Sequence, residues 1–81
     1  MGEQLLKKLS KQYEPDSMVT LKFRGYDMAV KTDKEGNPVL LFIGKADEAG
    51  HIKGDRYARR LIKDPNGLIV KDHWDYKGRT V

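Results

Sequence analysis

The chain of 81 residues contains no cysteine, which excludes disulfide scaffolds, cysteine-ligated zinc and thiol catalysis. A small secreted domain usually needs disulfides, so we expect a cytoplasmic location. No apolar run approaches the ~20 residues that span a membrane, and the N-terminus lacks the apolar region of a signal peptide. We therefore expect a single domain over residues 1–81 with no membrane span.

Groups that carry catalysis are also scarce. Ser10 and Ser17 are the two serines, and neither lies in a G-x-S-x-G motif. The two histidines, His51 and His73, fall on different predicted strands and too far apart along them to share a metal ion. Phosphate-binding glycine motifs are missing as well. We therefore expect a protein that is not an enzyme and that needs no metal or other cofactor.

The composition is that of a small folded domain with a mild basic charge. Sixteen Lys and Arg residues against twelve Asp and Glu residues give a net charge of +4. Hydrophobic residues make up 38% of the chain, which is too many for a disordered segment. The charge is compatible with nucleic-acid binding but is also ordinary for the solubility of a small domain.

A helix is predicted over residues 3–13. Four apolar side chains share one helical stripe, namely Leu5, Leu6, Leu9 and Tyr13. Lysines lie on the opposite side, and Glu14-Pro15 ends the helix because the residue before proline avoids helical torsion angles. We expect the leucine stripe to pack on the rest of the domain. The alternative is a basic amphipathic helix that attaches to a membrane surface.

The segment 18–32 changes to the period of a β-strand. Apolar residues are odd-numbered up to Phe23 and even-numbered from Tyr26 onward. A β-bulge at Gly25 would keep both halves pointing inward, so we predict one long, bent strand.

Three segments share the pattern D-x-x-G, beginning at Asp33, Asp47 and Asp64. Aspartate caps a type I turn and glycine accepts the positive φ of the bulge that follows, so each segment predicts a β-hairpin. The expected fold is α+β, with the N-terminal helix on a strongly twisted four-stranded antiparallel meander that can curl towards a half-barrel. The predicted strands are 18–32, 38–46, 51–63 and 68–77, with residues 78–81 frayed.

The turns also predict which side chains share a face. With three-residue loops, Val30 lies opposite Leu40, and Met28 lies opposite Phe42. The same register places Ala58 opposite Leu40 on one side and opposite Trp74 on the other. These residues form the predicted core face, which the helix covers.

The second face of the predicted sheet is apolar at its centre yet carries basic and aromatic groups. Five of its residues are the candidate binding residues: Lys31, Tyr57, Arg59, Lys71 and His73. A face of this kind predicts a protein-interaction or self-association surface, unless the sheet curls over it. Single-stranded nucleic acid binds similar faces by base stacking and phosphate contacts, which is the less favoured alternative because the ribonucleoprotein signature is missing.

Several segments resemble a family of short uncharacterised bacterial proteins. They are Phe23–Thr32, Gly54–Lys63, Pro65–Gly67 and Val70–Arg79, and the resemblance covers residues from about 18 to 79. It implies a stand-alone cytoplasmic protein. No activity is known for that family, so the resemblance assigns no catalytic or binding residue.

Overall fold

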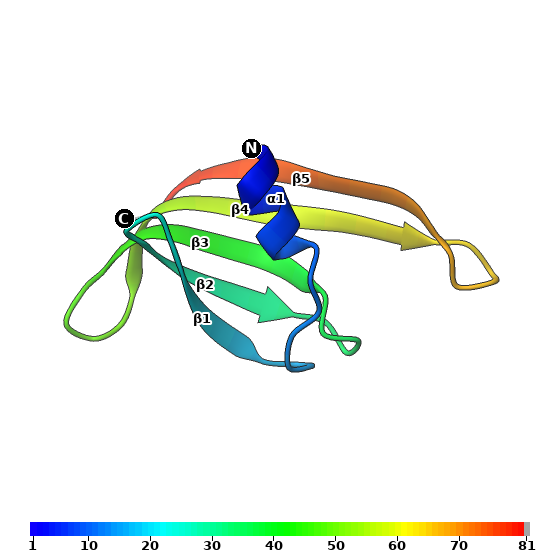
Figure 1. Ribbon diagram of the computed structural model, residues 1–81, viewed down its shortest axis with the longest axis horizontal. Coiled ribbons are helices and arrows are strands. Elements are labelled where there is room, and N and C mark those ends of the chain that lie inside the picture. The colour runs from blue at the N-terminus through cyan, green and yellow to red at the C-terminus, as the bar shows by residue number, and fades with distance from the viewer. Residues whose placement is uncertain (81) are drawn as a thin grey trace.

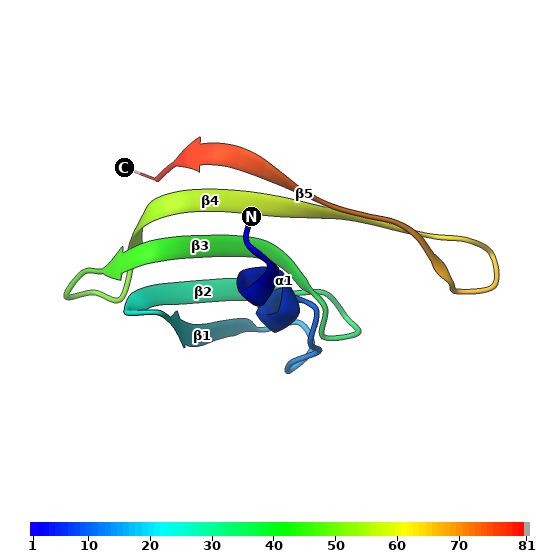
Figure 2. The ribbon, with the colours of Figure 1, turned by 45° about the horizontal axis from the view of Figure 1, so that its top comes forward.

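Five antiparallel strands follow one another along the chain and pair in the same order, in a computed structural model that describes residues 1–80 (Figure 1). The elements are α1 (Glu3–Leu9), β1 (Met18–Phe23), β2 (Tyr26–Thr32), β3 (Pro38–Ala46), β4 (Ile52–Lys63) and β5 (Ile69–Arg79). The predicted α+β class, with an N-terminal helix and an antiparallel sheet, is confirmed. The sheet has five strands rather than four, and it is open, with β1 and β5 as its edges (Figure 2).

The fifth strand comes from a hairpin within residues 18–32. Arg24 and Gly25 form its two-residue turn, with φ values of 49° and 81°, and Phe23 pairs with Tyr26. Positive φ at both central residues is the geometry of a type I′ turn, which suits the twist of the flanking strands. Because of this two-residue turn, the odd-numbered apolar residues of β1 lie opposite the even-numbered apolar residues of β2, as Leu21 lies opposite Met28. The change from odd to even positions therefore comes from a hairpin rather than from a bulge, and the prediction of one bent strand is wrong.

The helix is shorter than predicted and ends at Leu9. Ser10 closes it, because its hydroxyl donates a hydrogen bond of 2.7 Å to the carbonyl of Leu6. The chain then turns away, so that the amide of Tyr13 can donate to the carbonyl of Gly36 at 2.9 Å. Leu5 and Leu9 are buried in the core, whereas Leu6 is 38% exposed, so the predicted leucine stripe packs on the sheet only in part. No helix within residues 1–80 is long and apolar enough to cross a membrane.

The three D-x-x-G turns are confirmed and share one geometry. In each turn the glycine amide donates to the aspartate carbonyl at 3.0 Å, and the glycine φ lies between 83° and 87°. Each aspartate side chain also accepts two backbone amides at 2.9 Å, as Asp64 does from Asn66 and Leu68. The side chain therefore satisfies turn amides that would otherwise need water.

Two β-bulges shift the register beyond these turns. Val39 is the extra residue between β2 and β3, so Val30 pairs with Leu41 rather than with the predicted Leu40. Between β4 and β5 the extra residue is Val70, so Ala58 pairs with Asp75 instead of Trp74. The middle hairpin has no bulge, and its predicted pairing of Leu40 with Ala58 is confirmed.

The shifted register changes which residues form the core. The buried cluster consists of Leu5, Leu9, Met28, Val30 and Leu41, and Trp74 packs against it. Phe42 pairs with Ala29 and so lies on the opposite side of the sheet from Met28. The prediction that Met28, Phe42 and Trp74 share the core face is therefore wrong for Phe42, because the bulge at Val39 turns the alternate residues of β3 towards the helix.

The last strand is longer than predicted. β5 continues to Arg79, and Thr80 donates its amide to the carbonyl of Gly54 at 2.8 Å. Residues 78 and 79, for which fraying is predicted, belong to β5, and Val81 lies outside the described residues. At the other end, the β4–β5 hairpin projects beyond the remaining strands as an arm (Figure 2). Its apolar side chains are exposed: Ile62, Leu68, Ile69 and Val70.

Candidate interaction surface

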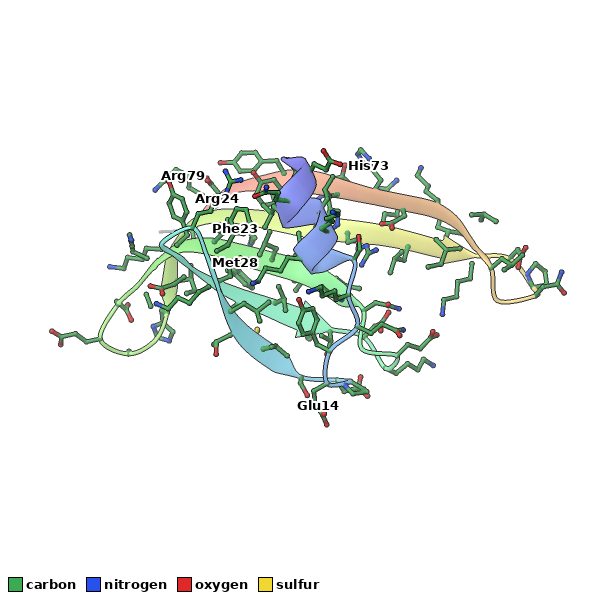
Figure 3. The ribbon with its side chains drawn as sticks, in the orientation of Figure 1. Glu14, Phe23, Arg24, Met28, His73 and Arg79 are labelled. Atoms are coloured by element: carbon green, nitrogen blue, oxygen red, sulfur yellow. The ribbon has the colours of Figure 1, made fainter. Side chains whose placement is uncertain are left out.

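The five candidate binding residues do not share a face. Tyr57 and Arg59 point to the side of the sheet that α1 covers, which we call the covered face. Lys31, Lys71 and His73 alternate with inward-facing residues and lie on the other side, which we call the open face. Figure 3 shows His73 on β5, at the edge of the sheet. The prediction of one common face is wrong, because the bulges redistribute the strands' side chains.

Arg59 has a structural role that the sequence did not reveal. Its side chain is only 6% exposed and forms two hydrogen bonds of 2.7 Å with the carboxylate of Asp72. It also donates to the carbonyl of Leu9 at 3.3 Å and to the carbonyl of Pro38 at 3.1 Å. The guanidinium lies 5.6 Å from the ring centre of Trp74, within the range of a cation–π contact. Arg59 thus holds the C-terminal end of α1 on the sheet and uses four of its five N–H donors within the fold.

The Arg59 contact also fixes the charge state of its partner. The hydrogen bond from Arg59 to Asp72 holds the pKa of that carboxyl below its ordinary value. A second contact acts near the other end of the helix, where Arg24 of the β1–β2 turn bonds to the side chain of Gln4. The helix is therefore attached to the sheet at both of its ends.

Tyr57 is likewise occupied within the fold. It packs against the core, and its ring meets Tyr76 edge-on at a centroid distance of 5.2 Å. The Tyr76 hydroxyl donates to Asp55 at 2.9 Å, and this carboxylate raises the pKa of the phenol. Neither tyrosine is placed on the open face.

The open face has an apolar centre that is only half-buried. This centre consists of Ala29, Leu40, Phe42 and Ala58, from the three central strands β2, β3 and β4. In the described part of the chain no helix lies over it, because α1 and its buried leucines pack on the other side (Figures 1 and 2). A patch of this kind on a sheet without a cover is typical of a surface that binds another molecule.

Basic residues surround this centre. The exposed cations on the open face are Lys22, Lys31, Arg56, Arg60 and Lys71. The two carboxylates are Asp27, which Lys22 pairs with, and Asp75, which lies 2.9 Å from His73 and 3.9 Å from Arg60. Bonds from Lys22 and from the Ala46 amide hold the pKa of Asp27 below its usual value. Positive charge therefore exceeds negative charge on this face.

One end of the open face is hollowed where the β3–β4 hairpin bends. The bend occurs at Gly44 and Gly54, which pair across the strands, and a Cβ on Gly44 would lie 2.0 Å from the carbonyl oxygen of Lys53. Only glycine permits this close approach of two backbones. The resulting hollow of about 450 Å³ is lined by Met18, Ala29, Phe42, Asp47, Gly50, His51, Ile52, Lys53 and Thr80.

The hollow extends the open face. Within residues 1–80, no three His, Asp or Glu side chains are grouped closely enough to hold a metal ion. His51 is exposed and has Asp47 at 3.8 Å as its ionic partner. The apolar lining from Phe42 and Ile52 is continuous with the centre of the face.

Sequence reasoning missed Leu40, Phe42 and Ala58 as surface residues and assigned them to the core. The segment from Val39 to Ile43 is apolar at every position, so its periodicity carries no information on which side faces the helix. The signal that could have decided the matter is the cationic alternation of β4. There Arg56, Ala58 and Arg60 share one side of the strand, whereas the side with Tyr57 holds one arginine.

No family model, no curated protein and no solved structure matches the chain. The resemblance to short bacterial proteins therefore stays a prediction.

Proposed function

We propose that the protein is a small, non-enzymatic interaction module whose open face binds an acidic surface of another protein. The proposal rests on an uncovered apolar centre around Phe42 and on the charged residues that surround it, which we call the rim. Cations outnumber carboxylates in the rim, which consists of Lys22, Lys31, Arg56, Arg60, Lys71, Asp27 and Asp75. Protein interfaces commonly have this arrangement, with an apolar centre and a polar rim. Lys31, Lys71 and His73 lie on this face, and we include them in the proposed binding surface.

The charge of the rim selects among partners. Two copies of the chain meeting open face to open face would bring two positively charged rims together, and like charges across an interface are unfavourable. An acidic partner would instead pair with these side chains and would be attracted at a distance. The rim therefore favours a different, acidic protein over a face-to-face homodimer.

Nucleic acid is the alternative occupant of the same face. The basic rim suits phosphates, but Phe42 is the single aromatic residue at the centre, and it is half-buried among aliphatic side chains. Base stacking on sheets uses exposed aromatic rings, commonly two or three of them. The open face therefore fits an apolar protein surface better than unstacked bases.

NMR titration tests the proposal. The probes are an amphipathic peptide of leucine and glutamate, the same peptide with glutamine in place of glutamate, and an oligothymidine. We expect the acidic peptide to shift the amides of Leu40, Phe42 and Ala58, with much weaker effects from the glutamine peptide. Shifts produced only by the oligothymidine, and lost steeply with salt, would replace the proposal with nucleic-acid binding.

Matched charge variants sharpen the test. Lys31 is exposed on the open face, so Lys31→Glu should weaken binding of the acidic peptide, whereas Lys7→Glu on the exposed side of α1 should not. Equal weakening by both variants would mean that net charge, rather than this face, controls binding.

A further inference from the structure

We infer that the free edge of β5 pairs with the same edge of a second copy, antiparallel about a two-fold axis at His73. β5 is the last strand of an open sheet, and no element of residues 1–80 lies beyond it (Figure 2). An edge strand presents unpaired amides and carbonyls, which another strand can satisfy. At eleven residues, β5 is also a longer edge than the six-residue β1. The inference does not depend on the proposed function of the open face.

The part of β5 that can form a regular ladder is well defined. Lys71 to Tyr76 pair without interruption with Ile62 to Tyr57, between two bulges. Lys71, His73 and Asp75 point to the open face along this segment, and the intervening residues point to the covered face. A second strand can therefore pair with this segment without meeting a kink.

Charge complementarity selects the register of the pair. An axis at His73 places Lys71 of each copy opposite Asp75 of the other, which forms two cross-strand ion pairs. Lys71 forms no ion pair within residues 1–80, and Asp75 keeps a third of its side chain exposed.

The neighbouring registers oppose like charges. An axis at Asp72 or at Asp75 would place that carboxylate opposite its own copy. An axis at Trp74 would bring Lys71 close to Lys77, which lies at the second bulge of the other copy. Since like charges directly opposite each other destabilise a strand pair, the axis at His73 is the register that this sequence favours.

The same register covers exposed apolar surface. It brings Tyr76, which is 55% exposed, to the end of the regular segment, next to the bulge residue Val70 of the second copy, which is 63% exposed in the single chain. Aromatic and β-branched residues stabilise each other across strands. The two sheets would become one continuous sheet, and their open faces would lie side by side.

Sedimentation measurements with charge reversals test the inference. The contact between two edge strands is small, so we expect a weak dimer whose mass rises with concentration and stops at two chains. Lys71→Glu and Asp75→Lys should each weaken the dimer by about tenfold, and the double variant should return to within a few-fold of the wild type. Within one chain these two positions lie about 13 Å apart along the strand, so restoration must come from pairing between copies.

Several outcomes would overturn the inference. The wild type could stay strictly monomeric at the concentrations used for NMR, or its mass could grow beyond the dimer. The double variant could fail to restore association. Lys71→Glu could strengthen the dimer, which would indicate the axis at Trp74. The control Lys7→Glu, with the same change of charge on α1, should leave the dimer unchanged, and an equal loss there would show an effect of net charge alone.

Discussion

The two faces of the sheet carry similar apolar side chains, but α1 covers only one of the two faces. On the covered face, Leu9, Val30 and Leu41 are fully buried. On the open face, Leu40 and Phe42 are half-buried although they come from the same strand as Leu41. Sequence hydrophobicity alone therefore does not decide burial in this protein. A seven-residue helix, attached to the sheet through Arg59 and Arg24, makes one face a core and leaves the other as a surface.

Neighbouring residues of β4 show the same difference. Arg59 is buried and bonded to Asp72 and to two backbone carbonyls, whereas Arg60, the next residue, is exposed and lies 3.9 Å from Asp75. Two arginines that look alike in the sequence therefore have different roles. Alanine substitutions at matched positions can measure how far the covered and open parts differ in their contribution to the free energy of unfolding.

The largest contrast is expected between Leu41→Ala and Leu40→Ala. Leu41 is fully buried, so its truncation should lower the free energy of unfolding by about 2–5 kcal/mol. Leu40 is half-exposed, and its truncation should cost below about 1.5 kcal/mol. Urea unfolding followed by circular dichroism measures both values. Equal losses at the two positions would mean that the open face is covered in solution and would remove the basis of the proposed function.

The sequence predicted the parts of this fold that local chemistry determines. Each D-x-x-G turn formed as expected, because aspartate and glycine satisfy the turn without help from distant residues. The register failed at Val39 and at Val70, where nothing local distinguishes a bulge from a regular strand. The register depends on which side of β3 packs against the helix, and this is determined by tertiary contacts rather than by the local sequence.

The wrong register also led to a wrong prediction of which candidate binding residues share a face. The predicted register, which has no bulge at Val39, places Arg59 and Tyr57 on the second face together with Lys31, Lys71 and His73. The choice between the two faces follows from one register shift, and a shift of one residue exchanges them. Lys31, Lys71 and His73 lie on the open face, and their part in binding stays a prediction.

The second contrast is between Arg59→Ala and Arg60→Ala. Removing Arg59 leaves Asp72 and two carbonyls without their donor, so the loss of unfolding free energy should be about 2–3 kcal/mol. Arg60→Ala should cost below about 0.5 kcal/mol, as expected for an exposed ion pair. Arg59→Lys should recover little, because lysine cannot bond both oxygens of Asp72 and the carbonyls together. Full recovery in thermal unfolding would show that charge alone, rather than the bonding geometry, holds the helix.

The third contrast compares the same turn in two settings, through Gly36→Ala and Gly67→Ala. Both glycines have positive φ, so each substitution should cost about 1 kcal/mol from backbone strain. At Gly36 a Cβ would also lie 2.2 Å from the carbonyl oxygen of Tyr13, in the segment that joins α1 to β1, whereas at Gly67 the space is open. We expect Gly36→Ala to cost about 1 kcal/mol more than Gly67→Ala in urea unfolding. A smaller loss at Gly36 would mean that the segment after α1 is only loosely held on the sheet.

The smallest effect concerns pH and the pair that holds the helix. The pKa of Asp72 is lowered in the folded protein by its bond from Arg59, so the unfolded chain binds the proton more readily. The stabilisation from this pair is therefore fully present above the unfolded pKa of about 3.9 and is lost as the pH falls through the lower, folded value. Because Asp72 is partly exposed, we expect the pair to contribute only about 0.5 kcal/mol to the free energy of unfolding.

The free energy of unfolding of the wild type should exceed that of Asp72→Asn at pH 6, and the two curves should converge near pH 2. Other carboxylates, such as Asp47 with its bond from the His51 amide, contribute equally to both curves. Curves that stay parallel down to low pH would show that the Arg59 bonds to the two carbonyls, rather than the ion pair, keep α1 on the covered face.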